Sequence, residues 1–547
     1  MVNSVNNKVW SALESSLVPP SASTTWYYST LLKKSVEVVC LLPLGIVTGT
    51  FAGVGKVGSF AFSFFKSSPV VDPRKDFQAV VNDSRLWDKI GTVQQIEQDL
   101  INNPNGLQWG IKGVGTSTFQ DSPNEVPDSQ WTPDGYQQRI PKAHRPGPHM
   151  NLFKLYKTSE GRRELIDRLQ KLHVTHYRFS VEWSHLQPKE GAWNQDNMQV
   201  YVDLCKDLRD AGIDPIVVLL HFSEPKWFHA KGSFENEKNI TYFANFSSQV
   251  FDQLTEDYQG RPLVERFCTI NEPAVDPFMR YVLGKFSPTG NFFKNFWNGR
   301  ILNFAKAGIF LKNLLKAHGV VYKELKRKKP TVQVGIIHQY LNMQPTNSLL
   351  IPAVRYFTRL VNEVPMNFFR SGGKFDLKVP FLCNIEEQCA APKTDFVGTQ
   401  YYALPVIGST GPTSNGAPWT KMPFPEAPEG IYEAIVETHK AFGVPVLVTE
   451  TGISTDDDQQ RSRVMLRTLY AIREAIKAIG VSNVLGISWW CFVKNSELEQ
   501  GTAQDFGLYA AQTEKGLPAE PKPGVQAWIR IAQAWEKRAR AKEQKTA

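Results

Sequence analysis

Two glutamates stand at the ends of apolar runs and could carry out acid-base and nucleophilic chemistry. Glu272 lies in Thr-Ile-Asn-Glu-Pro at residues 269–273, and Glu450 lies in Val-Thr-Glu-Thr-Gly at residues 448–452. Two carboxyl groups that face one cavity are the minimum requirement for cleaving a glycosidic bond, because one donates a proton while the other acts as nucleophile or base. The two segments therefore suggest a site of this kind, provided that the fold brings them together.

The elements that would position these glutamates are eight short apolar runs separated by amphipathic helical segments. The runs comprise residues 106–114, 176–181, 215–221, 267–272, 332–337, 395–402, 444–450 and 484–490. Between them the helical period is clear, as in Leu165, Ile166, Leu169 and Leu172, which share one face. Alternation of strands with helices implies parallel pairing. Eight such units predict an α/β fold, a (β/α)8 TIM barrel with long βα loops.

A barrel of this type places its active site at the carboxyl ends of the strands. Polar and aromatic residues stand at six of these predicted ends. They are Arg178, His221, Asn271 with Glu272, Tyr401 with Tyr402, Glu450, and Trp489 with Trp490. A single polar residue at a strand end is usually a cap or a loop anchor, but six ends that contribute to the same rim indicate a site.

These residues resemble family 1 of the glycoside hydrolases, the retaining β-glucosidase and β-galactosidase family, over residues 106–508. The resemblance rests on five segments taken in order. They are Tyr-Arg-Phe-Ser-Val-Glu-Trp-Ser at 177–184, His221, residues 269–273, Asp-Phe-Val-Gly at 395–398 followed by Tyr401-Tyr402, and Thr449-Glu450.

The resemblance implies a role for each matching residue. Glu272 would be the general acid/base and Glu450 the nucleophile, Asn271 would bind the sugar 2-hydroxyl, and Arg178 and Tyr402 would keep Glu450 ionised. The residues implied to hold the sugar are Gln120, His221 and Glu497 for its hydroxyls and Trp490 for the apolar face of the ring. No metal or organic cofactor is required.

The departures from the family pattern surround the sugar pocket. The altered positions are Phe222, Gln400, Thr451, Lys494, Ser496 and Leu498. The choice between glucose and galactose therefore stays open, and Lys494 leaves open a phosphorylated sugar.

The amino-terminal part departs from a plain barrel enzyme. We expect residues 1–66 to form a hydrophobic, helical extension in which residues 36–65 could associate with a membrane, and residues 67–104 to be a linker. The barrel domain is expected at 105–535 and a basic tail at 536–547. We expect a membrane-associated protein with its barrel facing the cytoplasm. The alternative is a soluble cytoplasmic protein whose extension packs on the barrel.

The distribution of charge argues against a nucleic-acid partner, and the cysteines do not indicate a metal site. The net charge of +9 comes partly from local runs at residues 323–329 and 537–545, without interleaved aromatics. The six cysteines are scattered and lack metal-ligand spacing, which favours reduced, buried thiols.

The prediction for function is a retaining β-glycosidase that hydrolyses β-glucosides or β-galactosides through a covalent glycosyl-enzyme. Two alternatives stay open: a membrane-associated transglycosylase that acts on glycolipids, and a non-catalytic sugar-binding member of the fold. The aglycone and the oligomeric state are not indicated by the sequence.

Overall fold

The computed structural model describes residues 93–132, 140–287, 302–341, 343–346, 350–380, 382–408, 411–413, 417–422 and 424–546. The extension expected at 1–66, its membrane segment at 36–65 and most of the expected linker lie outside these ranges. None of the helices in these ranges is long and apolar enough to cross a membrane.

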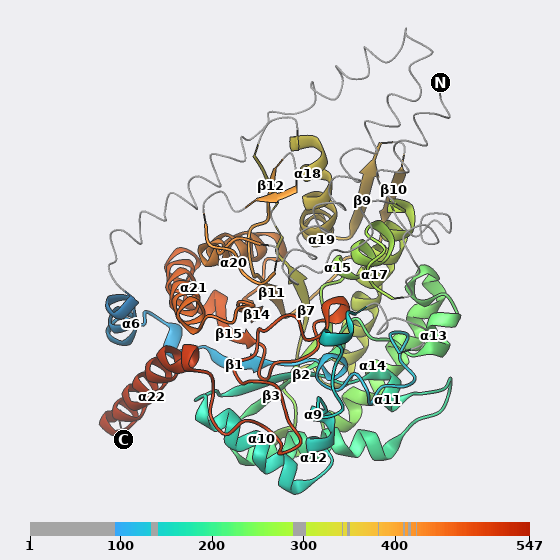
Figure 1. Ribbon diagram of the computed structural model, residues 1–547. Helices are drawn as coiled ribbons and strands as arrows, with labels where there is room; N and C mark the ends of the chain where they lie inside the picture. Colours follow the sequence, from blue (N-terminus) through green and yellow to red (C-terminus); the bar gives the residue numbers. More distant parts are fainter. Residues whose placement is uncertain are drawn as a thin grey trace.

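Eight parallel strands close into a barrel in the order β1-β15-β14-β11-β7-β6-β3-β2, which confirms the predicted fold class (Figure 1). The strands are β1 (Ile111–Gly115), β2 (His176–Ser180), β3 (Asp214–Leu220), β6 (Arg266–Ile270), β7 (Gln333–Gln339), β11 (Phe396–Gln400), β14 (Val446–Thr451) and β15 (Val484–Trp490). Each strand overlaps one of the eight predicted runs, and β15 matches its run residue for residue.

The first predicted run begins too early. Gly106 has a φ of 100°, a left-handed conformation open to glycine, and residues Leu107–Trp109 form a 3-10 turn. The strand starts only at Ile111. The apolar content of residues 106–110 thus belongs to a turn that leads into the barrel.

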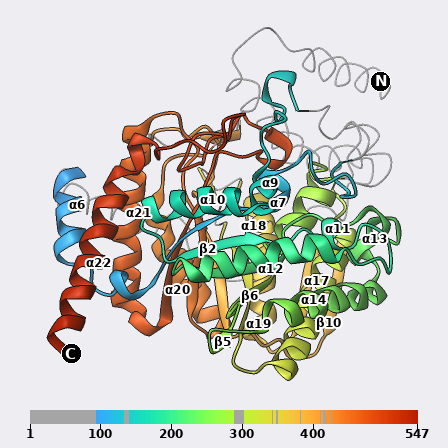
Figure 2. The same cartoon turned by 90° about the horizontal axis from the view of Figure 1, so that it is seen from below.

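Helices surround the barrel on its outer side (Figures 1 and 2). The longer ones are α10 (Ser159–Lys171), α12 (Gln195–Asp210), α14 (Ile240–Leu254), α17 (Phe304–Lys328), α20 (Ile431–Phe442), α21 (Asp458–Ile479) and α22 (Gln526–Thr546). The shorter ones include α7 (Thr118–Asp121), α9 (Leu152–Tyr156), α11 (Trp183–Leu186), α13 (Lys226–Ala230), α15 (Val275–Pro277), α18 (Ile351–Thr358) and α19 (Val364–Arg370).

The barrel has an inner and an outer apolar layer. Its inside is filled by a cluster that includes Ile216 and Val218 of β3, Ile337 of β7 and Leu447 of β14. The outer layer packs the strands against the helices and forms the largest core cluster among the described residues. Strands buried on both faces carry continuous apolar runs, which is why the sequence revealed them.

Helix α10 shows how the helical period produces this packing. The Thr158 hydroxyl accepts from the backbone N–H of Gly161 at 3.1 Å and caps the helix start. Leu165 and Leu169 are fully buried on the face that the sequence predicted.

Small sheets form outside the barrel, within the loops. They are the hairpin β9 (Lys374–Val379) with β10 (Cys383–Gln388), the pair β4 (Asp257–Tyr258) with β5 (Arg261–Pro262), and a sheet of β8 (Gln344–Pro345), β12 (Val406–Gly408) and β13 (Gly411–Thr413).

Both boundaries expected for the barrel domain fall within or next to helices that pack on it. Helix α6 (Val93–Asn102) occupies the end of the expected linker and buries Ile96 and Leu100. It lies beside α22 in both views (Figures 1 and 2), and Trp535 donates its indole N–H to the Leu100 carbonyl at 3.1 Å. Helix α22 continues past residue 535 to Thr546, so the basic residues extend a barrel helix.

Candidate active site

The predicted site residues gather at the carboxyl ends of the barrel strands. Arg178 of β2 is paired with Gly115 of β1 and Ile216 of β3, and Gln400 at the end of β11 is paired with Glu450 of β14. This is the face that a TIM barrel uses for catalysis.

Arg178 is the central donor of the site. Its Nη1 donates to Glu450 Oε1 at 2.6 Å, and its Nη2 donates to Asn271 Oδ1 at 2.7 Å. The side chain is fully buried. Because a guanidinium is rigid and planar, it fixes the relative positions of the two acceptors as well as supplying charge.

Tyr402 supplies a second donor to Glu450. Its hydroxyl donates to Glu450 Oε2 at 2.6 Å, so both carboxylate oxygens are occupied. The hydroxyl of Tyr401 instead donates to the Ala427 carbonyl. The resemblance implied this role for Tyr402. The structure ends β11 at Gln400 and places Tyr402 in the following loop.

Asn271 and Glu272 extend β6 beyond its last ladder residue. The Asn271 N–H donates to the Leu220 carbonyl of β3 at 2.8 Å, and the Glu272 N–H donates to the Ile337 carbonyl of β7 at 3.1 Å. Glu272 has a φ of 44°, in the left-handed region that side chains rarely adopt. The backbone at this point is therefore held by both neighbouring strands in a strained conformation.

The two carboxyls have unequal surroundings. Burial raises the pKa of Glu272 well above its usual value, and the charges of Glu450 and Glu497 raise it further. Burial also raises the pKa of Glu450, but the Arg178 charge and donors from Arg178, Tyr402 and Gln400 oppose that rise. Glu450 therefore loses its proton before Glu272 does, as an acid and nucleophile pair requires.

His221 and Trp490 form one wall of the site. Their rings stack with centroids 5.8 Å apart and an interplanar angle of 16°. Burial, together with the charge of Arg178, lowers the pKa of His221 well below its usual value, so the imidazole is neutral. Its Nε2 lies 3.4 Å from the Asn271 amide nitrogen, while its Nδ1 has no hydrogen-bond partner in the described part of the chain.

Gln120 and Glu497 meet in the loops that follow β1 and β15, which are neighbouring strands of the barrel. The Gln120 amide donates to Glu497 Oε2 at 3.2 Å. Burial, followed by the charge of Glu450, raises the pKa of Glu497 to about 8, although donors from Trp490 and Gln120 lower it. Each of the predicted site residues thus contacts or interacts electrostatically with another of the set.

Sequence reasoning missed several contacts that shape the site. Gln400, noted only as a departure, donates to Asn271 Oδ1 at 2.9 Å. The carbonyl of Phe222, next to His221, accepts from Trp131 at 2.7 Å and from Gln130 at 2.8 Å. The strand-end position of Gln400 was a usable signal, whereas nothing in the sequence linked residues 130 and 131 to His221.

The comparisons with known proteins agree with this geometry. Residues 160–370 match the family model of glycosyl hydrolase family 1. The β-glycosidase from Pyrococcus horikoshii superposes with a TM-score of 0.65 and 26% identity, over 78% of this chain and 94% of that one. By these matches the barrel is similar to family 1 glycoside hydrolases. The matched residues contain Asn271 and Glu272, while Glu450 lies beyond them.

Two relatives illustrate the range within the family. Beta-glucosidase A from Thermotoga maritima is 25% identical over 449 residues, which cover 74% of this chain and 92% of the relative. The chloroplastic galactolipid galactosyltransferase SFR2 from Arabidopsis thaliana is 27% identical over 365 residues, which cover 63% of this chain. The chain spans about half, 52%, of that plant protein's length.

Proposed function

We propose that the chain is a retaining β-glycosidase that hydrolyses β-glucosides or β-galactosides. The observation that supports the proposal is the asymmetry of the two buried carboxyls. Glu450 accepts from Arg178 and Tyr402, whereas burial and neighbouring charges keep the proton on Glu272. One carboxyl is thus prepared as a nucleophile and the other as an acid.

The reaction would proceed by double displacement. The Glu450 carboxylate attacks the anomeric carbon while Glu272 gives its proton to the leaving oxygen, which breaks the glycosidic bond and forms a glycosyl-enzyme. Glu272, now a carboxylate, takes a proton from water, and the water oxygen attacks the same carbon and releases Glu450. Two inversions retain the configuration.

Trapping of the intermediate tests this proposal. Protein incubated with activated 2-deoxy-2-fluoro β-glucoside or β-galactoside is analysed intact and as peptides by mass spectrometry. A one-sugar adduct on the peptide that contains Glu450 is expected, and it would identify the accepted sugar. The matched variant Glu450→Gln should carry no adduct. Folded wild-type protein that gives no adduct with either sugar would favour the non-catalytic alternative.

A second candidate is transfer of the sugar to a lipid hydroxyl in place of water. It is favoured by the relative from Arabidopsis thaliana, which is named a galactolipid galactosyltransferase. The test supplies monogalactosyl diacylglycerol in vesicles and separates the products. A lipid with two sugars indicates transfer, whereas free galactose alone indicates hydrolysis.

The proposal includes membrane association through residues 36–65, which lie outside the described ranges. Deleting residues 1–66 should release the protein from membranes without removing the hydrolysis of soluble aryl glycosides. Membrane binding that survives the deletion would contradict this part of the proposal.

A further inference from the structure

A buried carboxylate next to the sugar-binding residues has no role in the proposed reaction. Asp121 follows Gln120 at the end of α7 and is 4% exposed. Its Oδ1 accepts from the Asn495 amide at 3.0 Å. Its Oδ2 is buried without a hydrogen-bond partner among the described residues.

Asp121 takes part in a series of hydrogen bonds between two loops. Residues 120–121 follow β1, and residues 495–497 follow β15, the strand that closes the barrel beside β1. Besides the Asp121–Asn495 contact, the Ser496 N–H donates to the Gln120 carbonyl at 3.0 Å. The Gln120 amide donates to Glu497 at 3.2 Å. The two candidate sugar-binding residues, Gln120 and Glu497, thus lie at one end of this series of hydrogen bonds, and Asp121 lies next to them.

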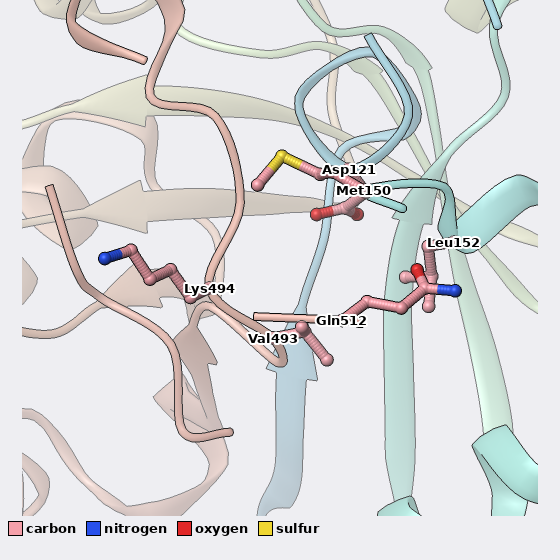
Figure 3. Close-up of a pocket in the computed structure, with 6 residues that line it drawn as sticks. All are labelled: Asp121, Met150, Leu152, Val493, Lys494 and Gln512. Atoms are coloured by element: carbon pink, nitrogen blue, oxygen red, sulfur yellow. The ribbon is translucent and has the colours of Figure 1, made fainter. Parts of the chain in front are cut away.

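The Asp121 carboxylate lines a small cavity. The cavity has a volume of about 10 Å³, which accommodates about one water molecule. Figure 3 shows the Asp121 carboxylate at this cavity, with Met150, Leu152 and Val493 around it.

No basic side chain neutralises Asp121 within the described ranges. The Lys494 side chain is directed away from the carboxylate (Figure 3), and its ammonium lies 3.7 Å from Asp505. Burial raises the pKa of Asp121 to about 7, although hydrogen bonding from Asn495, from the Thr116 hydroxyl and from the Ser117 backbone N–H opposes that rise. A water molecule in the cavity can donate to the carboxylate or accept from the protonated carboxyl, so it satisfies Oδ2 in either state.

We propose that Asp121, together with one water molecule bound in this cavity, is a positioning residue that holds Gln120 and Glu497 in place for sugar binding. It acts through Asn495, which it anchors by Oδ1 while the water fills the space beside Oδ2. This inference rests on the proposed function, because it assigns Gln120 and Glu497 to the sugar.

Crystal structures of the wild type and of Asp121→Ala test the positioning directly. The wild type should show one water within hydrogen-bond distance of Asp121 Oδ2. In Asp121→Ala the Gln120–Glu497 contact should open beyond hydrogen-bond distance. Asp121→Asn, which keeps an acceptor for Asn495 and a polar group toward the water, should preserve the contact. A dry cavity in the wild type, or an unchanged contact in Asp121→Ala, would overturn the inference.

Kinetics then separate positioning from general damage to the fold. Asp121→Ala should lower kcat/KM for 4-nitrophenyl glycosides about 10-fold or more, because a buried hydrogen-bonding network is broken. In the Glu497→Gln background the same change should cost less than about twofold, since Asp121 acts through Asn495 on the Gln120–Glu497 contact, which Glu497→Gln already alters. Equal losses in both backgrounds would contradict the inference. Asp196→Ala, at an exposed position on α12, is the matched control.

The structural and kinetic readouts also distinguish the two proposals. If the wild type cleaves no glycoside, the proposed function fails, while the two crystal structures still decide whether Asp121 holds Gln120 against Glu497.

Discussion

Arg178 and Glu450 form a buried ion pair of 2.6 Å between β2 and β14, two strands that are not neighbours in the barrel. The pair therefore spans the barrel mouth, and the second branch of the guanidinium reaches Asn271. One side chain sets both the charge state of Glu450 and its distance from the residue expected to bind the 2-hydroxyl.

Replacing Arg178 should separate these two effects. Arg178→Lys keeps a positive charge but cannot donate along two fixed directions, so kcat/KM should fall about 10- to 100-fold, the value of one charge-assisted hydrogen bond. Arg178→Met should lose more, because Glu450 and Asn271 are both left without their buried donor. Initial rates with aryl glycosides measure both variants. Equal losses of kcat/KM in the two variants would show that the two fixed donor directions of the guanidinium do not matter for activity.

Removing the acid/base should affect substrates according to their leaving groups. Glu272→Ala should lower kcat for poorly activated glycosides about 100- to 10,000-fold, the usual contribution of a positioned proton donor. Dinitrophenyl glycosides need no such donor, so their glycosyl-enzyme should still form and accumulate. Azide should then restore turnover and give a β-glycosyl azide, identified by NMR. An α-azide would contradict the double displacement.

Tyr402→Phe should move the acidic limb of the pH profile. The hydroxyl lowers the pKa of Glu450, which must be ionised to attack. Without this donor the pKa of Glu450 rises, so activity should disappear at a higher pH as the solution is acidified. The measurement is kcat/KM against pH for wild type and variant. Tyr401→Phe, whose hydroxyl contacts Ala427 instead, should leave that limb in place.

Glu497 should reduce stability at alkaline pH. Its pKa is about 8 in the folded protein, against an ordinary value of 4.5. Between these values the folded state holds a proton that the unfolded state has released, so the free energy of unfolding falls as pH rises through this window. Glu497→Gln cannot ionise and should melt at least roughly 2 °C above wild type at pH 9. The difference should vanish near pH 4. A constant difference across this range would contradict the shifted pKa.

Most of the barrel could be predicted from the sequence, whereas the finer contacts of the site could not. Strands buried on both faces leave continuous apolar runs, so β15 was delimited without error. Strand ends then indicated Arg178, Asn271 and Glu450, because parallel strands bring their carboxyl ends to one rim. The start of β1 was misplaced because apolar content does not encode the left-handed turn at Gly106.

Contacts between loops depend on side-chain directions that no periodicity records. Asp121 and Asn495 lie 374 residues apart in the chain, and no shared pattern links them. Gln400 reaches Asn271 only because β11 ends where it does. Such contacts can be identified only from the folded structure of the barrel.

The left-handed backbone at Glu272 has a consequence for engineering. A side chain at this φ costs about 1 kcal/mol or more relative to glycine, whereas a glycine there would be relaxed. Directed evolution that selects only for heat resistance should therefore favour glycine at position 272. Libraries screened in this way would become enriched in heat-resistant proteins that have lost their proton donor. Selection must therefore also require catalytic turnover.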